Sequence, residues 1–350
     1  MDTIIQKINS EFFEDCELEK ACQILKQGGL VAFPTETVYG LGGDALSQDA
    51  AKKIYTAKGR PSDNPLIVHI ADMKSLYDVA QNISRKALDL AEAYWPGPMT
   101  MIFQKTDKVP LSTTGGLNTV AVRMPSHPIA KELIRQSGVY VAAPSANTSG
   151  RPSPTRAEHV IEDLQGKIDM IIDGGHVGIG LESTIVDMTG ETPVILRPGY
   201  ITKEMLEEVA GEVDDPAVLM TEPMKNIVAK APGMKYRHYA PRGQLTIVEG
   251  KEEAVIQKIN EIVLQKEQEG CNVAVIATEE SKDRYHCKQI FSIGSRKSEG
   301  SIAAGVYDIL RRMDAIGAEY IYTESFAQDH LGQAIMNRMI KAAGYHKIEV

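Results

Sequence analysis

Apolar positions recur at two spacings along the chain, and the spacing predicts which segments are helices and which are strands. Apolar side chains fall every three or four residues in segment 17–27, and the glycine pair at 28–29 marks the end of a predicted amphipathic helix. Short apolar runs at 30–33, 66–70 and 99–103 are typical of buried strands. The two patterns alternate along the chain, which favours an α/β fold.

The same reasoning completes a first unit. It predicts helices at 50–57, 85–94, 127–135, 155–164 and 202–210, and strands at 118–124, 139–143, 170–172, 182–187 and 193–196. We therefore expect a first domain over residues 1–212.

The pattern changes after this unit. Residues 214–242 show little periodicity and contain four prolines, which predicts a linker over residues 213–242. Beyond it the pattern predicts strands at 245–248, 272–277, 289–293 and 320–322, and helices at 252–269, 301–313 and 332–343. We expect a second, smaller α/β domain over residues 243–350, Rossmann-like and with a mostly parallel sheet.

Composition narrows the class of protein. The 350 residues are 43% hydrophobic and 24% charged, which is ordinary for a globular protein, and the net charge is −9. A negative chain does not coat nucleic acid through bulk charge, so any basic site must be local. The sequence shows no signal-peptide pattern, no apolar run long enough for a membrane and no zinc-like cysteine spacing. We expect a cytoplasmic protein without membrane association.

Segment 58–69 is the strongest candidate for chemistry. Lys58, Arg60 and Asn64 lie in a stretch that two prolines hold in an extended path, and the stretch runs into an apolar strand that contains His69. An ammonium and a planar guanidinium close together are typical of a site for phosphate oxygens. The alternative is a surface turn with two solvated charges.

Further polar groups follow other predicted strands, where α/β folds place ligands. They are hydroxyls at Thr35, Thr119, Ser145, Ser153 and Ser183 and guanidinium groups at Arg123, Arg151 and Arg197. Neither a nucleophile elbow nor a nucleotide-binding glycine fingerprint is present. Positioning a polyanion and neutralising its charge, as in phosphoryl or nucleotidyl transfer, fits this set better than covalent catalysis.

Five ordered segments add a resemblance. Segments 34–41, 58–66, 121–125, 143–147 and 235–241 closely resemble the threonylcarbamoyl-AMP synthase family in its longer, two-domain form. The resemblance implies a YrdC-like first domain, an open twisted mixed sheet with a concave basic cavity. It also implies nucleotidyl transfer, in which L-threonine, bicarbonate or CO2, and ATP give threonylcarbamoyl-AMP and pyrophosphate for tRNA modification.

The resemblance also assigns roles by position. Threonine would be held by Thr35, His69, Arg123, Ala143 and Ser183. ATP would be held by Lys58, Arg60, Asn64, Thr119, Ser145, Ser153, Arg197 and Tyr236. Lys58 and Arg60 would be catalytic, receiving the pyrophosphate, and Mg²⁺ would be held mainly by the ATP phosphates rather than by protein ligands.

The linker and the partners complete these expectations. Its second half, residues 231–242, combines three cations, two tyrosines and a histidine, so it can stack bases and touch phosphates, or it can be a solvated tether. We expect it to act as a lid over the product. The product would pass to a tRNA threonylcarbamoyl transferase complex, with weak RNA binding at most. The alternatives are a carbamoyl-adenylate-forming enzyme and an RNA-binding protein that uses the same cavity.

Overall fold

The computed structural model describes residues 2–216, 239–327 and 329–350, which form two compact units. The first unit comprises Met1–Ser149 and Ser153–Tyr236, and the second comprises Gly150–Pro152 and Arg237–Val350. Most of the predicted linker, including Tyr236, lies outside the described residues. The predicted domain boundaries and the lid therefore stay predictions.

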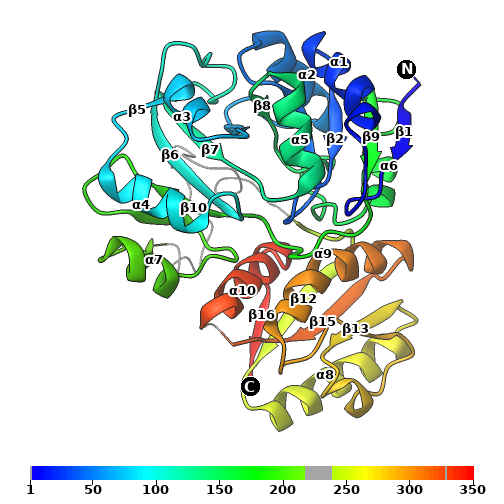
Figure 1. Ribbon diagram of the computed structural model, residues 1–350. Helices are drawn as coiled ribbons and strands as arrows, with labels where there is room; N and C mark the ends of the chain where they lie inside the picture. Colours follow the sequence, from blue (N-terminus) through cyan, green and yellow to red (C-terminus); the bar gives the residue numbers. More distant parts are fainter. Residues whose placement is uncertain (1, 217–238, 328) are drawn as a thin grey trace. The chain divides into compact units, whose positions relative to one another are not determined.

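The first unit is built on a mixed sheet of eleven strands (Figure 1). In chain order they are β1 (Ile4–Lys7), β2 (Val31–Phe33), β3 (Gly40–Asp44), β4 (Ile67–His69), β5 (Ala80–Gln81), β6 (Met99–Lys105), β7 (Thr119–Arg123), β8 (Val141–Ala142), β9 (Met170–Asp173), β10 (Thr184–Asp187) and β11 (Val194–Arg197). Their order in space is β1-β9-β2-β3-β8-β4-β7-β6-β10-β11, with β5 paired to β6. The predicted mixed α/β fold is confirmed.

Local sequence explains where the helices begin and end. The unit contains α1 (Glu19–Lys26), α2 (Gln48–Lys58), α3 (Lys74–Val79), α4 (Arg85–Tyr94), α5 (Pro128–Ser137), α6 (Ala157–Leu164) and α7 (Lys203–Ala210). The hydroxyl of Ser47 accepts a hydrogen bond from the Ala50 N–H and so caps α2. Gly59 takes a left-handed conformation (φ 59°) and ends the helix, which leaves Lys58 as its last residue.

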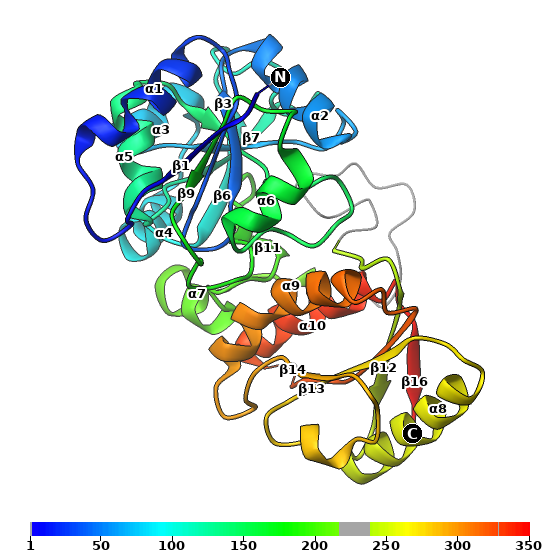
Figure 2. The same cartoon turned by 90° about the vertical axis from the view of Figure 1, so that its right-hand side faces the viewer.

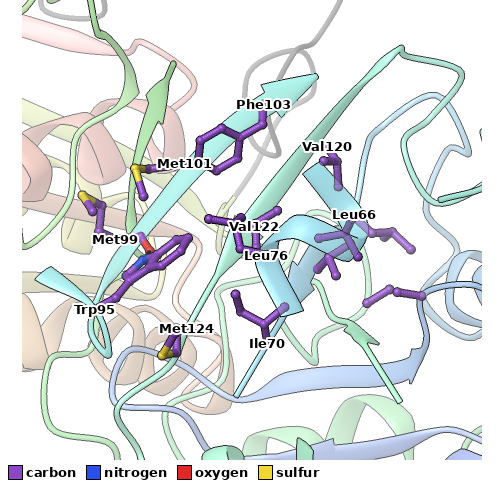
Figure 3. Packing of buried hydrophobic residues seen from close by; sticks show 14 of the residues in the cluster. Leu66, Ile70, Leu76, Trp95, Met99, Met101, Phe103, Val120, Val122 and Met124 are labelled. Atoms are coloured by element: carbon purple, nitrogen blue, oxygen red, sulfur yellow. Dashed lines mark hydrogen bonds between the residues drawn. The ribbon is translucent and has the colours of Figure 1, made fainter. Parts of the chain in front are cut away.

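One face of this sheet carries the main core. Alternate residues of the central strands, among them Met101, Phe103, Val120 and Val122, pack there under helices of the same unit (Figure 3). Residues of α2, α4, α6 and α7 belong to the same cluster. Burial of this large apolar area is the principal force that fixes the strand order.

The opposite face is divided into two parts. Helices α1 and α5 lie together over β2, β8 and β9 on this side of the sheet (Figure 2). The strands β4, β6, β7, β10 and β11 contribute a separate small apolar cluster, Ile67, Ala121, Ile102, Ile185 and Leu196. All five residues lie on strands, so no described helix contributes to this cluster. We call this part of the face, to which no described helix contributes although its apolar side chains are mostly buried, the open half.

The second unit is a smaller three-layer arrangement. Its strands are β12 (Gln244–Glu249), β13 (Val273–Ala277), β14 (Ile290–Ser292), β15 (Tyr320–Glu324) and β16 (Lys347–Glu349), and its helices are α8 (Glu252–Gln268), α9 (Glu299–Ala315) and α10 (His330–Ala342). Helix α8 covers one face, and α9 and α10 cover the other (Figure 2). The four pairings between neighbouring strands are all parallel, as predicted.

The strand order of this unit differs from a Rossmann arrangement. The order is β14-β13-β15-β12-β16, so β15 separates the first strand, β12, from the second, β13. In the dinucleotide-binding fold the first two strands are neighbours. The Rossmann-like part of the prediction is therefore not confirmed.

A glycine-rich segment forms a strand that the apolar pattern did not predict. Gly40–Asp44 is β3, antiparallel to β2. A Cβ atom on Gly42 would lie 2.7 Å from both the Phe33 ring and a Val141 methyl group. The glycine makes room for side chains across the sheet, so here it indicates close packing rather than a turn. The elements β1, α3, β5 and β16 were not predicted.

Candidate functional site

Three neighbouring strands bring predicted site residues to one end of the open half. His69 ends β4 and Arg123 ends β7, and the two are register partners in this parallel pair. Thr100, near the start of β6, is the register partner of Arg123 on its other side. Paired residues project to the same face of a sheet, so these three side chains lie side by side.

Arg123 is the centre of this group and is buried. Its Nη2 lies 2.8 Å from Oε1 of Glu36, and its Nη1 donates a 2.9 Å hydrogen bond to the Thr37 hydroxyl. Burial is the largest single influence and would raise the pKa of Glu36, but the charge of Arg123 and the N–H groups near the carboxylate together outweigh burial and lower that pKa below its ordinary value. Glu36 is therefore ionised at neutral pH, and a buried charge pair lies at the strand ends.

Two histidines near this pair are held neutral. Burial lowers the pKa of His69 to about 3, and the charge of Arg123 lowers it further in the same direction. Burial also lowers the pKa of His127 to about 4, although Glu36 opposes the shift. Both imidazoles are therefore polar but uncharged groups at neutral pH.

The next strands add a serine and a second guanidinium group. The Ser183 hydroxyl lies 2.7 Å from the Thr100 hydroxyl, and Arg197 donates to both the carbonyl and the hydroxyl oxygens of Ser183. Arg197 is also the register partner of Ile185 in the open half. The structure thus brings Ser183 and Arg197 to the same strand ends as Arg123.

Thr35 and Ala143 contribute to the site through the backbone around them. The Thr35 hydroxyl donates to the Val38 carbonyl at 2.6 Å and contacts the Thr37 hydroxyl at 2.9 Å. Ala143 follows β8, and its N–H donates to the Ile67 carbonyl of β4. Thr35 therefore fixes the loop that carries Glu36 and Thr37.

Lys58 is not the solvated charge of the alternative interpretation. It is buried, and its ammonium group donates to the carbonyl oxygens of Ser145 and Asn147 and, at 3.4 Å, to the Asn147 side-chain oxygen. The Ser145 hydroxyl donates to the same Asn147 oxygen. These bonds occupy the three N–H groups of the ammonium, so Lys58 holds the loop after β8.

Arg60 and Asn64 form a second local group. Arg60 donates to the Asn64 carbonyl and, at 3.0 Å, to the Pro65 carbonyl. The Asn64 side chain is buried, yet its oxygen has no hydrogen-bond partner. A buried amide oxygen without a donor is typical of a position that a ligand or water satisfies.

The other predicted ATP residues are more dispersed. The Ser153 hydroxyl donates to Glu182 at 2.6 Å, next to Ser183 in sequence. Thr119 begins β7, on the same face as Arg123 but four residues away, which corresponds to about 13 Å along a strand. Tyr236 lies outside the described residues. The concave basic cavity stays a prediction.

Sequence reasoning missed Glu36, Thr37, Asn147 and Glu182 as site residues. Each lies within or beside a predicted polar loop, but its role depends on a partner far along the chain. Glu36 and Thr37, for example, meet Arg123 only because the loop after β2 reaches the end of β7. Spacing in the sequence carries no signal for such a contact.

Comparison with known proteins identifies the family of this chain. A family model described as telomere recombination matches residues 23–199, and one described as threonylcarbamoyl-AMP synthase, C-terminal domain, matches residues 201–344. The threonylcarbamoyl-AMP synthase of Pyrococcus abyssi is 47% identical over 99% of this chain and 100% of its own. The chain belongs to the threonylcarbamoyl-AMP synthase family. The Bacillus subtilis family member is 49% identical over 94% of each chain.

Solved structures of relatives show the same fold. The crystal structure of Pyrococcus abyssi Sua5 complexed with L-threonine aligns with a TM-score of 0.93 at 47% identity, covering 99% of this chain and all of that one. Escherichia coli YciO aligns with a TM-score of 0.51 at 25% identity and covers 57% of this chain and 96% of its own. The family's two-domain form is thus present in this chain.

None of the helices in the described residues is both long enough and apolar enough to cross a bilayer. The same residues hold no group of three His, Cys, Asp or Glu side chains arranged to bind a metal ion.

Proposed function

We propose that this protein is a nucleotidyltransferase that converts L-threonine, bicarbonate or CO2, and ATP into threonylcarbamoyl-AMP and pyrophosphate. The near-full-length likeness to threonylcarbamoyl-AMP synthases supports the reaction. Support for the amino acid comes from the relative solved with L-threonine, which shares 47% of its residues with this chain. The buried Arg123 at the strand ends is the observation that carries the proposal, since a guanidinium matches a carboxylate.

We assign the amino acid to the end of the open half. Arg123 would bind the α-carboxylate, with Ser183, His69, Thr35 and the Ala143 backbone around it. His69 suits this place because a neutral imidazole adds hydrogen bonds without adding charge. The proposal keeps both bicarbonate and CO2 as sources of the carbamoyl carbon.

We assign the nucleotide to the loops next to this pocket. Asn64, Ser145, Ser153, Arg197, Thr119 and Tyr236 would bind ATP together with Lys58 and Arg60. In this proposal Lys58 acts on the phosphates mainly through its charge, because its N–H groups hold the loop that carries Ser145. Arg60, at the start of the extended segment, would bind phosphate oxygens with its planar donor fork.

The chemistry follows from this placement. The threonine ammonium first loses a proton to solvent, and the free amine then adds to CO2 and releases a second proton to give a carbamate. A carbamate oxygen attacks the α-phosphorus of ATP while pyrophosphate leaves toward Lys58 and Arg60. Positioning and charge neutralisation supply the rate enhancement, as in other phosphoryl transfers. We assign no side chain as general base.

Mg²⁺ enters this proposal with the nucleotide. The described residues offer no three-ligand metal site, so the fit is to a metal held mainly by the ATP phosphates. There it would neutralise phosphate charge. The product would pass, in the cytoplasm, to a tRNA threonylcarbamoyl transferase complex.

Pyrophosphate release tests the proposal directly. Purified wild-type protein with ATP, Mg²⁺ and bicarbonate should release pyrophosphate only when L-threonine is added. Arg60→Ala should lower this release by roughly 100-fold or more, as expected for loss of a donor to developing phosphate charge. Arg85→Ala, which changes an exposed arginine on α4, is the matched control and should behave as wild type. Release that does not depend on threonine would refute the assignment.

A further inference from the structure

The ion pair between Glu36 and Arg123 contains unused hydrogen-bonding capacity. Their contact at 2.8 Å falls short of hydrogen-bond geometry, and neither the carboxylate oxygens of Glu36 nor Nη2 of Arg123 makes a hydrogen bond of good geometry, although all three atoms are buried. Nδ1 of the nearby His127 is also buried without a partner. Native proteins satisfy nearly all buried polar atoms, so several unsatisfied atoms at one place indicate a missing ligand.

The burial of this pair is not explained by stability. The side chains of Arg123 and Glu36 are 5% and 14% exposed, and removing two charges from water costs more than a single contact usually returns. A surface pair would avoid that cost. The pair is therefore better explained by what it binds than by what it contributes to folding.

The chemistry of the pair identifies the ligand group. A free amino acid carries a carboxylate and an ammonium on the same carbon, so its receptor needs a fixed cation and a fixed anion side by side. Arg123 and Glu36 supply them at adjacent positions, and the neutral His69 and His127 leave that pairing of charges undisturbed. Glu36 is ionised because Arg123 lowers its pKa.

We propose that Glu36 binds the α-ammonium of the amino-acid substrate while Arg123 binds its α-carboxylate. This inference rests on the proposed function and adds the residue that recognises the amine. The role is one of binding and orientation, because a carboxylate with a lowered pKa is a weak base. Glu36 thus holds the nitrogen close to the strand ends before the nitrogen reacts.

Two ligands that differ only in the amine test the proposal. (R)-3-Hydroxybutanoate has the carboxylate, hydroxyl and methyl groups of L-threonine but lacks its ammonium. A hydrogen bond between charged groups corresponds to roughly 10- to 100-fold in affinity, so wild-type protein should bind L-threonine tighter than the analogue by that factor in calorimetric titrations. Equal affinity for the two ligands would overturn the proposal without any variant.

Glu36→Gln then shows whether Glu36 is responsible. This variant should lose the preference for L-threonine while its affinity for (R)-3-hydroxybutanoate stays the same or increases. Glu132→Gln is the matched control, because Glu132 also pairs with an arginine but lies on α5, and it should keep the preference. If Glu36→Gln weakens both ligands equally, Glu36 only orients Arg123 and the proposal fails. If wild-type protein neither binds L-threonine nor releases pyrophosphate with it, the proposed function itself fails.

Discussion

Each unit of this protein contains a glutamate with little exposed surface beside an arginine, and the two glutamates have different surroundings. In the first unit neither oxygen of Glu36 receives a hydrogen bond of good geometry. In the second unit Oε1 of Glu324 accepts from the Thr278 N–H, the Thr278 hydroxyl and the Ser281 hydroxyl, and Oε2 accepts from Arg296 at 2.7 Å. Glu324 is therefore satisfied by its own unit, whereas Glu36 is not.

The difference separates a structural polar cluster from a site prepared for a ligand. Glu324 lies at the carboxyl end of β15, and Thr278 follows the carboxyl end of β13, where parallel sheets place ligands. On its location alone, Glu324 would therefore be a candidate ligand-binding residue. Because its acceptors are already occupied, we interpret it as the group that ties the ends of β13 and β15 together. Unsatisfied polar atoms therefore distinguish a ligand site from a structural cluster better than a position at the end of a strand does.

The largest expected effect comes from removing the satisfied carboxylate. Glu324→Ala removes the shared acceptor of a buried N–H and two buried hydroxyl groups and leaves them only weaker contacts with one another, so the free energy of unfolding of the second unit should fall by about 2–4 kcal/mol. Urea denaturation measures this free energy of unfolding. Glu261→Ala, which removes an exposed partner of Lys258, is the control and should cost less than about 1 kcal/mol. Similar small costs for both variants would remove the distinction drawn above.

Replacing both members of each pair should give opposite results. Arg123→Met with Glu36→Leu removes two buried charges that satisfy little else, so stability should stay equal or rise by up to about 1–4 kcal/mol while L-threonine binding is lost. Arg296→Met with Glu324→Leu should lower stability, since Thr278 and Ser281 lose their acceptor. Thermal unfolding with and without L-threonine measures both double variants. Shifts of the same sign would contradict the comparison.

The sequence predicts the parts of the site that depend on local pattern. Arg123 and His69 end apolar strands, and strand alternation places Arg123 on one face with Thr119. Their position at the ends of neighbouring strands therefore follows from spacing. The family motifs then assign their roles. Most helices and strands were predicted for the same reason, because periodicity reports which face of an element is buried.

What the sequence could not predict depends on contacts between distant segments. The short polar-rich β1 pairs with β9 more than 160 residues later, and nothing local marks it as a strand. From the sequence alone, Lys58 could equally be a solvated charge. In the structure it is the last residue of α2, and its ammonium group donates to the loop after β8. A sequence shows which residues are charged, but it does not show which distant group contacts a charged side chain and so determines whether that side chain is buried.

Acid should affect the two units unequally, because the buried histidine with the lowest pKa lies in the first. His69 stays neutral in the folded protein down to a pH of about 3, whereas in the unfolded chain it is protonated below about 6.5. Unfolding therefore takes up a proton between these limits, so falling pH favours the unfolded state, by about 1.4 kcal/mol per pH unit well below 6.5. His69→Gln, which retains a donor for the Ile67 carbonyl, should make the pH dependence of the unfolding free energy shallower by that amount between pH 6 and 4.5. His176→Gln changes an exposed histidine of the same unit and should leave the slope unchanged. Parallel slopes for wild type and His69→Gln in urea denaturation would show that His69 is not held neutral at the end of the open half.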